Sequence, residues 1–271
     1  SSTSRGLGDV YKRQNINNMA LKSVRLFSLF ILLGITLYSK AQNLRIDGYK
    51  GIWYTIGQKS EYGDKYSGGL ATYTANHTPV AIYASKVDKT FFVYGGTTSE
   101  KDKHLLIMIS CYDHKSGTLA RPVVVCDKMG VDDPHDNASL TIDSDGFIWV
   151  FVSGRNVSRL GQVYKSTMPY CIDHFEKKYQ SVITYPQPWY IEGKGFIHLF
   201  TKYTAERTFG RELYWSTSPD GINWTPDKKL AGMGGHYQLS NVWKNKVVTV
   251  FNYHPDGGAD SRTNVYLVQT E

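Results

Sequence analysis

The sequence has few of the patterns that build disulfide-rich, zinc-binding or helical proteins. It contains only three cysteines, Cys111, Cys126 and Cys171, with no CxxC pair and no zinc-type spacing. An odd number in an exported chain allows one disulfide at most, so buried apolar thiols are the favoured interpretation. Residues 42–271 also lack any long stretch with the 3.6-residue hydrophobic period of a helix. These absences exclude a disulfide scaffold and favour an all-β fold.

The excess of positive charge is small once the N-terminal segment is set aside. The chain has 31 Lys and Arg against 24 Asp and Glu, a net charge of +7. Six of these basic residues and one acidic residue fall within residues 1–41, which leaves 25 against 23, or +2. Charge therefore gives no support to a nucleic-acid partner, and none is expected.

Residues 19–41 have the features of a secretory signal peptide. A methionine is followed by Lys22 and Arg25, by the apolar run 26–38 and by Ser-Lys-Ala at 39–41. The apolar run is too short to span a bilayer comfortably. The sequence therefore predicts a secreted or periplasmic protein with no membrane attachment after cleavage.

Residues 1–18 precede this methionine and contain no targeting or folding element. We interpret them as a non-native leader, and we assign the folded domain to residues 42–271.

A β-rich unit recurs in the chain with a spacing near fifty residues. Four apolar runs align so that Tyr94, Phe151, Phe200 and Phe251 are equivalent, at spacings of 57, 49 and 51 residues. Each run follows another strand-like segment and a turn, such as the one at Asp145-Gly146. Such a period, with about four strands per unit, is the signature of a β-propeller. A β-sandwich, the alternative, would not explain the regular spacing.

The pattern predicts about four to five blades. Four hairpins are clear, and residues 51–55 supply a further strand. Residues 216–224, STSPDGINW, resemble the aspartate-box turn of sialidase-type propellers, one residue short. The sequence stops on a strand-like segment without a closing element, and a propeller must close its ring to hide its edge strands. We therefore expect a propeller that lacks its C-terminal blades.

Polar residues stand at both ends of the predicted hairpins. In a hairpin the start of the first strand lies beside the end of the second, so these residues should meet at one face. The strand starts carry His77, His135, Gln187 and His236, and the strand ends carry Arg155, Tyr203, Asn252, Tyr253 and His254. Convergent polar groups in a concave site are the default active-site hypothesis. A structural role for a histidine repeated in each blade is the alternative.

This set of residues favours elimination over glycoside hydrolysis. It has no obvious carboxylate pair, which glycoside hydrolysis normally needs. It suits proton abstraction beside a carboxylate, with arginine as the neutralising group and histidine as the base. A tyrosine can donate a proton to the leaving oxygen. The combination would perform β-elimination on a uronate polymer.

Several segments resemble the BNR-repeat (BNR-4 type) propellers that include the ulvan lyases. The most specific are residues 66–70 and the triplet His135-Asp136-Asn137, and the resemblance covers nearly all of residues 45–271. It implies a secreted, seven-bladed propeller with a central cleft. Its lyases cut ulvan at rhamnose-sulfate–uronate linkages and leave an unsaturated uronate. Histidine and tyrosine act as acid–base groups, and arginine neutralises the carboxylate. No cofactor is required; a structural calcium is allowed by the family, although no ligand motif is present.

The resemblance also suggests roles for individual residues. His135 best matches the first family histidine, and the position of a second histidine, about twenty residues later, holds Arg155 or a neighbour. The candidate catalytic residues are His135, Tyr203, Arg211 and Tyr253. The candidate substrate-binding residues are His77, Arg155, Gln187, Trp189, Arg207, His236, Asn252 and His254. Arg207 is the alternative to Arg211 as carboxylate partner, and Trp189 is the best platform for stacking on a sugar.

The aspartates that flank His135 have more than one interpretation. Asp132, Asp133 and Asp136 can orient its imidazole or bind a cation, and a solvated loop is equally consistent with the pattern.

The sequence thus predicts a polysaccharide lyase, monomeric, that acts on an acidic, ulvan-like polysaccharide. A sialidase-like glycoside hydrolase is the second hypothesis, which Glu206 and Glu212 leave open. A carbohydrate-binding propeller without catalytic activity is the third, and it predicts binding of polymer without turnover.

Overall fold

The computed structural model describes residues 77–96, 104–131, 133–203, 210–232, 237–255 and 261–271. The predicted leader and signal segment lie outside these ranges. Within these ranges the chain forms strands joined by turns and loops. One short 3-10 helix, η2 (Pro134–Asp136), is defined among the described residues. No helix in the described part of the chain is long and apolar enough to cross a membrane.

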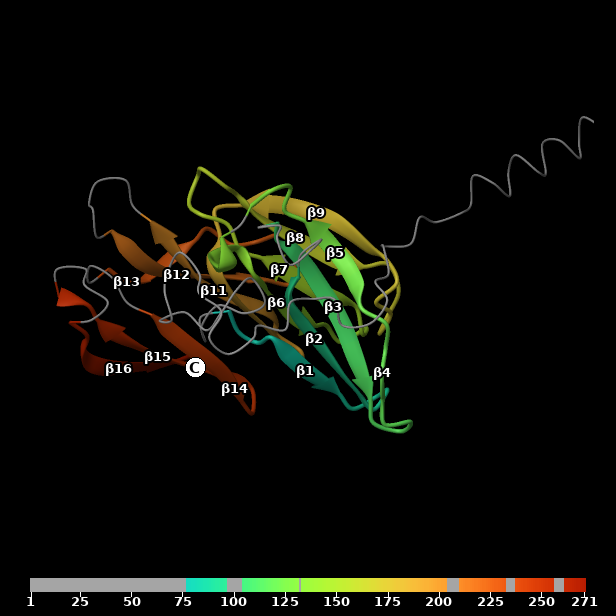
Figure 1. The fold of residues 1–271 in the computed structure, drawn as a ribbon. Coiled ribbons are helices and arrows are strands. Elements are labelled where there is room, and N and C mark those ends of the chain that lie inside the picture. The colour runs from blue at the N-terminus through green and yellow to red at the C-terminus, as the bar shows by residue number, and fades with distance from the viewer. Residues whose placement is uncertain (1–76, 97–103, 132, 204–209, 233–236, 256–260) are drawn as a thin grey trace, which may run out of the picture. The chain divides into compact units, whose positions relative to one another are not determined.

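The strands form four antiparallel sheets, which Figure 1 colours from cyan to red along the chain. The first contains β1 (Ala81–Ala84), β2 (Lys89–Gly96), β3 (Leu106–Asp113) and β4 (Thr118–Leu119), with β5 (Val123–Asp127) also paired to β3. The second contains β6 (Ala138–Ile142), β7 (Ile148–Val152), β8 (Gly161–Ser166) and β9 (Phe175–Ser181). The third contains β10 (Thr184–Ile191), β11 (Gly195–Tyr203), β12 (Arg211–Ser218) and β13 (Lys228–Ala231). The fourth contains β14 (Gln238–Trp243), β15 (Lys246–Tyr253) and β16 (Thr263–Gln269).

The sheets are the blades of a β-propeller arrangement, as the repeat predicted. Each is built from strands that are consecutive in the chain, and all but β5, which pairs with β3, pair with their sequence neighbours. The four aromatic residues used to align the repeat, Tyr94, Phe151, Phe200 and Phe251, lie on the second strand of successive sheets. The all-β propeller prediction is therefore confirmed, with four described blades.

The first strands of successive sheets are joined to one another. The backbone N–H of Leu140 in β6 donates to the carbonyl of Pro79, just before β1, at 2.9 Å. The Ser139 hydroxyl donates to the carbonyl of Pro186 in β10 at 2.7 Å. Gln187 in β10 bonds in turn to β14. Polar groups of the first strands are thus satisfied by the next blade, which sets the order of the blades.

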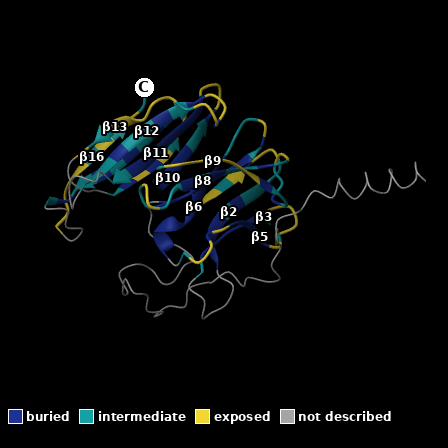
Figure 2. Cartoon of the chain, turned by 90° about the horizontal axis from the view of Figure 1, so that it is seen from above, coloured by how far each residue is buried: buried dark blue, intermediate teal, exposed yellow. Residues whose placement is uncertain are grey.

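The hydrophobic core lies between consecutive sheets. One cluster contains Phe91, Ile107 and Leu140 from the first and second sheets. Another contains aromatic residues of the second and third sheets, such as Phe151 and Phe196. Figure 2 shows most of these strands as buried, whereas β16 is largely exposed or half-buried. Burial between sheets, rather than within one sheet, holds the blades together.

The cysteines agree with the sequence-based interpretation. All three are free thiols, and Cys111 and Cys126 are buried in strands. Burial raises the pKa of both of these thiols, so they remain protonated and inert. Cys171 is half-buried.

The aspartate-box-like segment forms a compact turn after β12. Backbone N–H groups, first that of Asn223 at 2.7 Å, donate to the Asp220 carboxylate and hold its pKa well below its usual range. Gly221 has a φ of +77°, and a Cβ there would come within 2.8 Å of the Trp149 ring. Only glycine fits this position, because it tolerates the left-handed backbone and leaves room for the indole. Trp224 closes the turn by donating to the Gly221 carbonyl at 3.0 Å.

His198 lies inside the aromatic core, where burial changes its pKa. Its side chain in β11 packs against Phe151, Phe200 and Trp224, and the residue is 3% exposed. Its Nε2 has no hydrogen-bond partner among the described residues. Burial lowers the pKa of His198 from its ordinary value of 6.5 to about 3, so the folded protein keeps this imidazole neutral.

We predict that His198 makes the fold sensitive to acid. Between pH 6.5 and about 3 the unfolded chain binds one proton more at this residue, so stability rises with pH across this window and is lost as the pH falls. In His198→Phe, the free energy of unfolding measured by urea between pH 4 and 6.5 should vary less steeply, by about one proton. Phe200→Leu controls for repacking and should keep the wild-type slope. An unchanged slope in His198→Phe would contradict the prediction.

Candidate functional site

The predicted meeting of the hairpin ends is present in the structure. His77 precedes β1, and its Nε2 lies 2.9 Å from the backbone carbonyl of His135, which precedes β6. Arg155 follows β7, and its Nη1 lies 2.9 Å from the hydroxyl of Tyr203 at the end of β11. Residues far apart in sequence therefore converge where first strands begin and second strands end.

The turn η2 holds the imidazole of His135. Pro134 starts the turn, and Asp133 caps it by accepting the backbone N–H of His135 at 3.0 Å. The same oxygen lies 2.5 Å from Nδ1 of the His135 ring. Burial would raise the pKa of Asp133, but the hydrogen bonds from His135 and the charge of Arg155 hold it well below its usual range. Because an ionised carboxylate only accepts hydrogen bonds, the ring donates an Nδ1 proton to Asp133.

A network of ion pairs supports this arrangement. Arg159 Nη2 lies 2.6 Å from Asp133 Oδ2 and 2.9 Å from Asp136 Oδ1. Lys128 Nζ lies 3.0 Å from the other oxygen of Asp136, whose side chain is fully buried. Arg155 Nε lies 3.6 Å from Asp133 Oδ2. Of the roles expected for the flanking aspartates, these contacts support orientation of the imidazole; Asp132 lies outside the described residues.

Arg155 links the histidine to two tyrosines. Its Nη1 donates to the Tyr203 hydroxyl at 2.9 Å and to the Tyr185 hydroxyl at 3.5 Å, and the two hydroxyls are 3.4 Å apart. Burial lowers the pKa of Arg155, but Tyr203, Tyr185 and Asp133 outweigh this effect and raise it. The guanidinium is therefore a permanent positive charge beside two phenol oxygens. We call His135, Asp133, Arg155, Tyr185 and Tyr203 the polar cluster.

Tyr185 is the residue of the polar cluster that sequence reasoning missed. Its φ is +53°, an outlier for a bulky residue, and it is only 2% exposed. Its ring lies 5.5 Å from that of His77, 5.9 Å from that of His135 and 6.1 Å from that of Tyr237. It lies in β10 two residues before Gln187, the residue that the sequence assigned to the site. The tyrosine joins residues from all four blades.

Arg211 lies beside the polar cluster. It is paired directly across from Tyr203 in the β11–β12 ladder. Its Nη1 donates to the Tyr237 hydroxyl at 3.3 Å, and its guanidinium lies 5.5 Å from the centre of that ring. Tyr237 is adjacent to the predicted strand-start residue His236, which itself lies outside the described residues, as does Arg207.

His254 and Asn252, two of the predicted residues, lie on this side of the candidate site. His254 Nε2 lies 2.8 Å from Asn252 Oδ1, and the His254 ring stands edge-on to Tyr237 at 5.2 Å. Burial, together with the charges of Arg211 and Arg262, lowers the pKa of His254 to about 4. The imidazole is therefore neutral at physiological pH.

Three predicted residues are placed differently. Gln187 is fully buried, donates to the Gln238 carbonyl at 2.8 Å and accepts from Ser240 Oγ, so it fastens β10 to β14. Trp189 is half-buried and donates to the same Ser240 hydroxyl at 2.8 Å. Tyr253 ends β15, and no hydrogen bond or ring contact within the described residues ties its side chain to the polar cluster. The contacts of Gln187 and Trp189 are those of structural ties between blades.

The described residues do not fit the calcium site that the family resemblance allows. Among them there is no group of three or more His, Cys, Asp or Glu side chains arranged to hold a metal ion. Asp133 and Asp136, the nearest pair of carboxylates in the site, are occupied by Arg159, Arg155 and Lys128.

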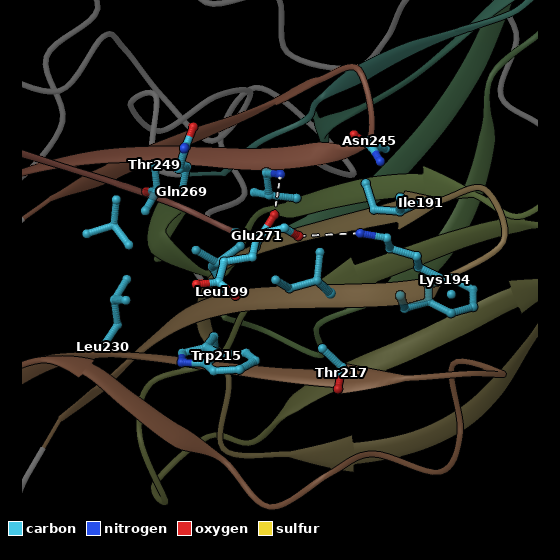
Figure 3. Close-up of a pocket in the computed structure, with 16 residues that line it drawn as sticks. Ile191, Lys194, Leu199, Trp215, Thr217, Leu230, Asn245, Thr249, Gln269 and Glu271 are labelled. Carbon is cyan, nitrogen blue, oxygen red and sulfur yellow. Dashed lines mark hydrogen bonds between the residues drawn. The ribbon is translucent and has the colours of Figure 1, made fainter.

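A separate cavity of about 490 Å³ lies between the third and fourth sheets (Figure 3). Its lining is mainly apolar and includes Leu199, Trp215 and Val247. At its edge Lys194 Nζ donates to the backbone oxygen of Glu271 at 3.4 Å. No residue of the polar cluster lines it, so it is distinct from the candidate site.

Comparison with known proteins gives a fold but no family. No protein-family model matches the chain, and no curated protein matches it. A solved structure described as a polysaccharide lyase of a new family, PL25 ulvan lyase, has a TM-score of 0.58 at 15% identity and covers 83% of this chain and 55% of its own. A second solved structure with this description, bound to -[GlcA(1-4)Rha3S]-, has the same TM-score, identity and coverage.

Two further solved structures are similar. A protein of unknown function from Dyadobacter fermentans DSM 18053 has a TM-score of 0.56 at 14% identity, with 84% of this chain and 59% of that chain covered. The polysaccharide lyase Uly1 has a TM-score of 0.52 at 12% identity, with 85% and 60% covered. The chain therefore spans between half and two thirds of the length of these structures, and at such identities the likeness shows the fold.

We predict that the buried ion pairs beneath His135 are needed for stability. Lys128→Met leaves the fully buried Asp136 without one of its cations, so the free energy of unfolding should fall by about 3 kcal/mol. Lys178→Met is the matched control because it removes an exposed pair with Glu176, which should cost less than about 1 kcal/mol. Urea unfolding of both variants measures the difference. Equal losses would contradict the structural role of Lys128.

Proposed function

We propose that this chain carries the active site of a polysaccharide lyase that cleaves an acidic, uronate-containing polysaccharide by β-elimination. The observation that carries the proposal is the contact between Arg155 and the Tyr203 hydroxyl, beside an imidazole held by Asp133. It places two proton-transfer groups and a fixed positive charge in one cluster. This is the set of groups that abstraction of a proton beside a carboxylate requires.

Each step of the elimination can be assigned to a residue of the polar cluster. His135 accepts the proton from C5 of the uronate on Nε2, and Asp133 stabilises the resulting imidazolium. The electron pair forms the C4–C5 double bond as the C4–O4 bond breaks. Tyr203 gives its proton to O4, and Arg155 stabilises the negative charge that develops on the phenol oxygen. The products are a free hydroxyl and an unsaturated uronate.

Arg211 is proposed to neutralise the substrate carboxylate. It is the cross-strand neighbour of Tyr203, and it stays charged because its pKa is raised. Burial lowers that pKa, but Tyr237, Tyr203 and Tyr185 outweigh the effect. A guanidinium on the carboxylate stabilises the charge that builds up when the C5 proton leaves.

The comparisons support the same class of substrate. Three of the similar structures are described as polysaccharide lyases, and one of them holds a fragment with glucuronic acid and sulfated rhamnose. A second histidine, His77, also reaches the polar cluster, through its contacts with His135 and Tyr185. The export predicted from residues 19–41 would bring the protein to such a polymer.

Glycoside hydrolysis is less well supported by the geometry. The reaction normally needs two carboxyl groups, one of them protonated, on either side of the bond. Asp133 is held as a carboxylate by His135 and Arg155. Asp136 is bound by Arg159 and Lys128, and Glu212 bonds to Lys229 and Tyr214. None of the three is placed as a general acid.

We predict that the full chain, mixed with ulvan and a panel of uronate polymers, produces ultraviolet absorbance from the C4–C5 double bond. Tyr203→Phe and His135→Ala should each lower the rate at least a hundredfold, because each removes a proton-transfer group. Tyr266→Phe, which removes a hydroxyl from β16 outside the polar cluster, should keep the wild-type rate.

Other results would separate the alternatives. New reducing ends without ultraviolet absorbance would identify a hydrolase and refute elimination. If the protein is retained on a polymer-containing gel but forms neither unsaturated uronate nor new reducing ends, it is a carbohydrate-binding module without catalytic activity.

A further inference from the structure

We infer that Arg262 and Arg211 form an oxyanion-binding subsite around the ring of Tyr237, next to the polar cluster. The inference rests on the proposed function for the kind of polymer that is bound. Both guanidinium carbons lie 5.5 Å from the centre of the Tyr237 ring. Arg211 starts β12 and Arg262 immediately precedes β16, so two different blades contribute to one small area.

The three residues of the subsite are at least partly exposed to solvent. Arg262 is exposed, and Arg211 and Tyr237 are half-buried, so a ligand can reach all three. Burial lowers the pKa of Arg211, but the phenols of Tyr237, Tyr203 and Tyr185 raise it, so the guanidinium stays charged. The two guanidiniums therefore place two positive charges beside one aromatic ring.

Two neighbouring rings hold the Tyr237 ring in place. His254 is fully buried and stands edge-on to Tyr237, and the two arginines help to keep it neutral. Tyr185 lies edge-on on the polar-cluster side at 6.1 Å. Tyr237 is thus fixed by one ring from its own blade and by one from the preceding blade, which orients the guanidiniums that lie against it.

The ligand chemistry follows from the guanidinium groups. Their planar donors match the paired oxygens of a carboxylate or of a sulfate ester, and these two groups are the oxyanions that acidic polysaccharides carry. Because Arg211 is the cross-strand neighbour of Tyr203, the oxyanion belongs to the sugar at the cleaved bond or to the sugar next to it. Arg262 is therefore a specificity-determining residue that distinguishes an anionic polymer from a neutral one.

The test compares binding by Arg262→Ala, Arg262→Lys and the control Arg121→Ala, which removes an exposed arginine of the first sheet's β4–β5 connection. Affinity electrophoresis of the full chain in ulvan, desulfated ulvan and carboxyl-reduced ulvan gives the dissociation constants. Arg262→Ala should weaken binding of ulvan about tenfold, the size expected for one charge-assisted contact. Arg262→Lys should restore part of this loss, and Arg121→Ala should bind as the wild type does.

The modified polymers identify the oxyanion. If the effect of Arg262→Ala disappears on desulfated ulvan, the subsite binds a sulfate ester; if it disappears on carboxyl-reduced ulvan, the subsite binds a carboxylate. Arg262→Ala that binds ulvan as tightly as Arg121→Ala does would overturn the subsite. Binding is measured without turnover, so Arg262-dependent binding without unsaturated product refutes the lyase alone. Unsaturated product with no effect of Arg262 refutes the subsite alone.

Discussion

The carboxylate of Asp133 is the group on which the rest of the candidate site depends. One of its oxygens accepts both the backbone N–H and the ring N–H of His135, and the other bonds to Arg159 and lies near Arg155. A single buried charge therefore sets the tautomer of the histidine and the positions of two guanidiniums. Burial of an ion is costly unless its partners satisfy it, and here every oxygen is satisfied. These contacts tie Asp133 to η2.

Positive charge is unevenly distributed in this nearly neutral domain. Residues 42–271 carry a net charge of only +2, so long-range attraction by the whole domain is weak. Arg155, Arg211 and Arg262 nevertheless gather around the tyrosines at the strand ends. Asp133 and Asp136 are bound in ion pairs with His135, Lys128 and Arg159. Among the described residues, arginines are thus concentrated at these strand ends.

The sequence predicted what depends on local patterns, and it failed where contacts between blades decide. Strand alternation and turn residues are local, so the repeat and the meeting of His135 with Arg155 and Tyr203 could be predicted. Gln187 was placed at a strand start, but a bulge in β10 shifts the register between Thr184 and Gln187. Tyr185, two residues earlier, contacts His77 and His135 instead, with a left-handed backbone that no sequence pattern reveals. Arg159, Tyr237 and Arg262 were missed because their partners come from other blades or loops.

Strand β10 connects the stability of the propeller to the geometry of the site. At one end it carries Tyr185, whose strained backbone persists only while the surrounding contacts hold it. Two and four residues later it carries Gln187 and Trp189, which bond to β14. The Tyr185 ring also contacts Tyr237, which immediately precedes β14. Separation of the third and fourth blades would therefore break the ties of β10 and release the strained tyrosine together. The arrangement of proton-transfer groups is thus a property of the packed blades and not of any one loop.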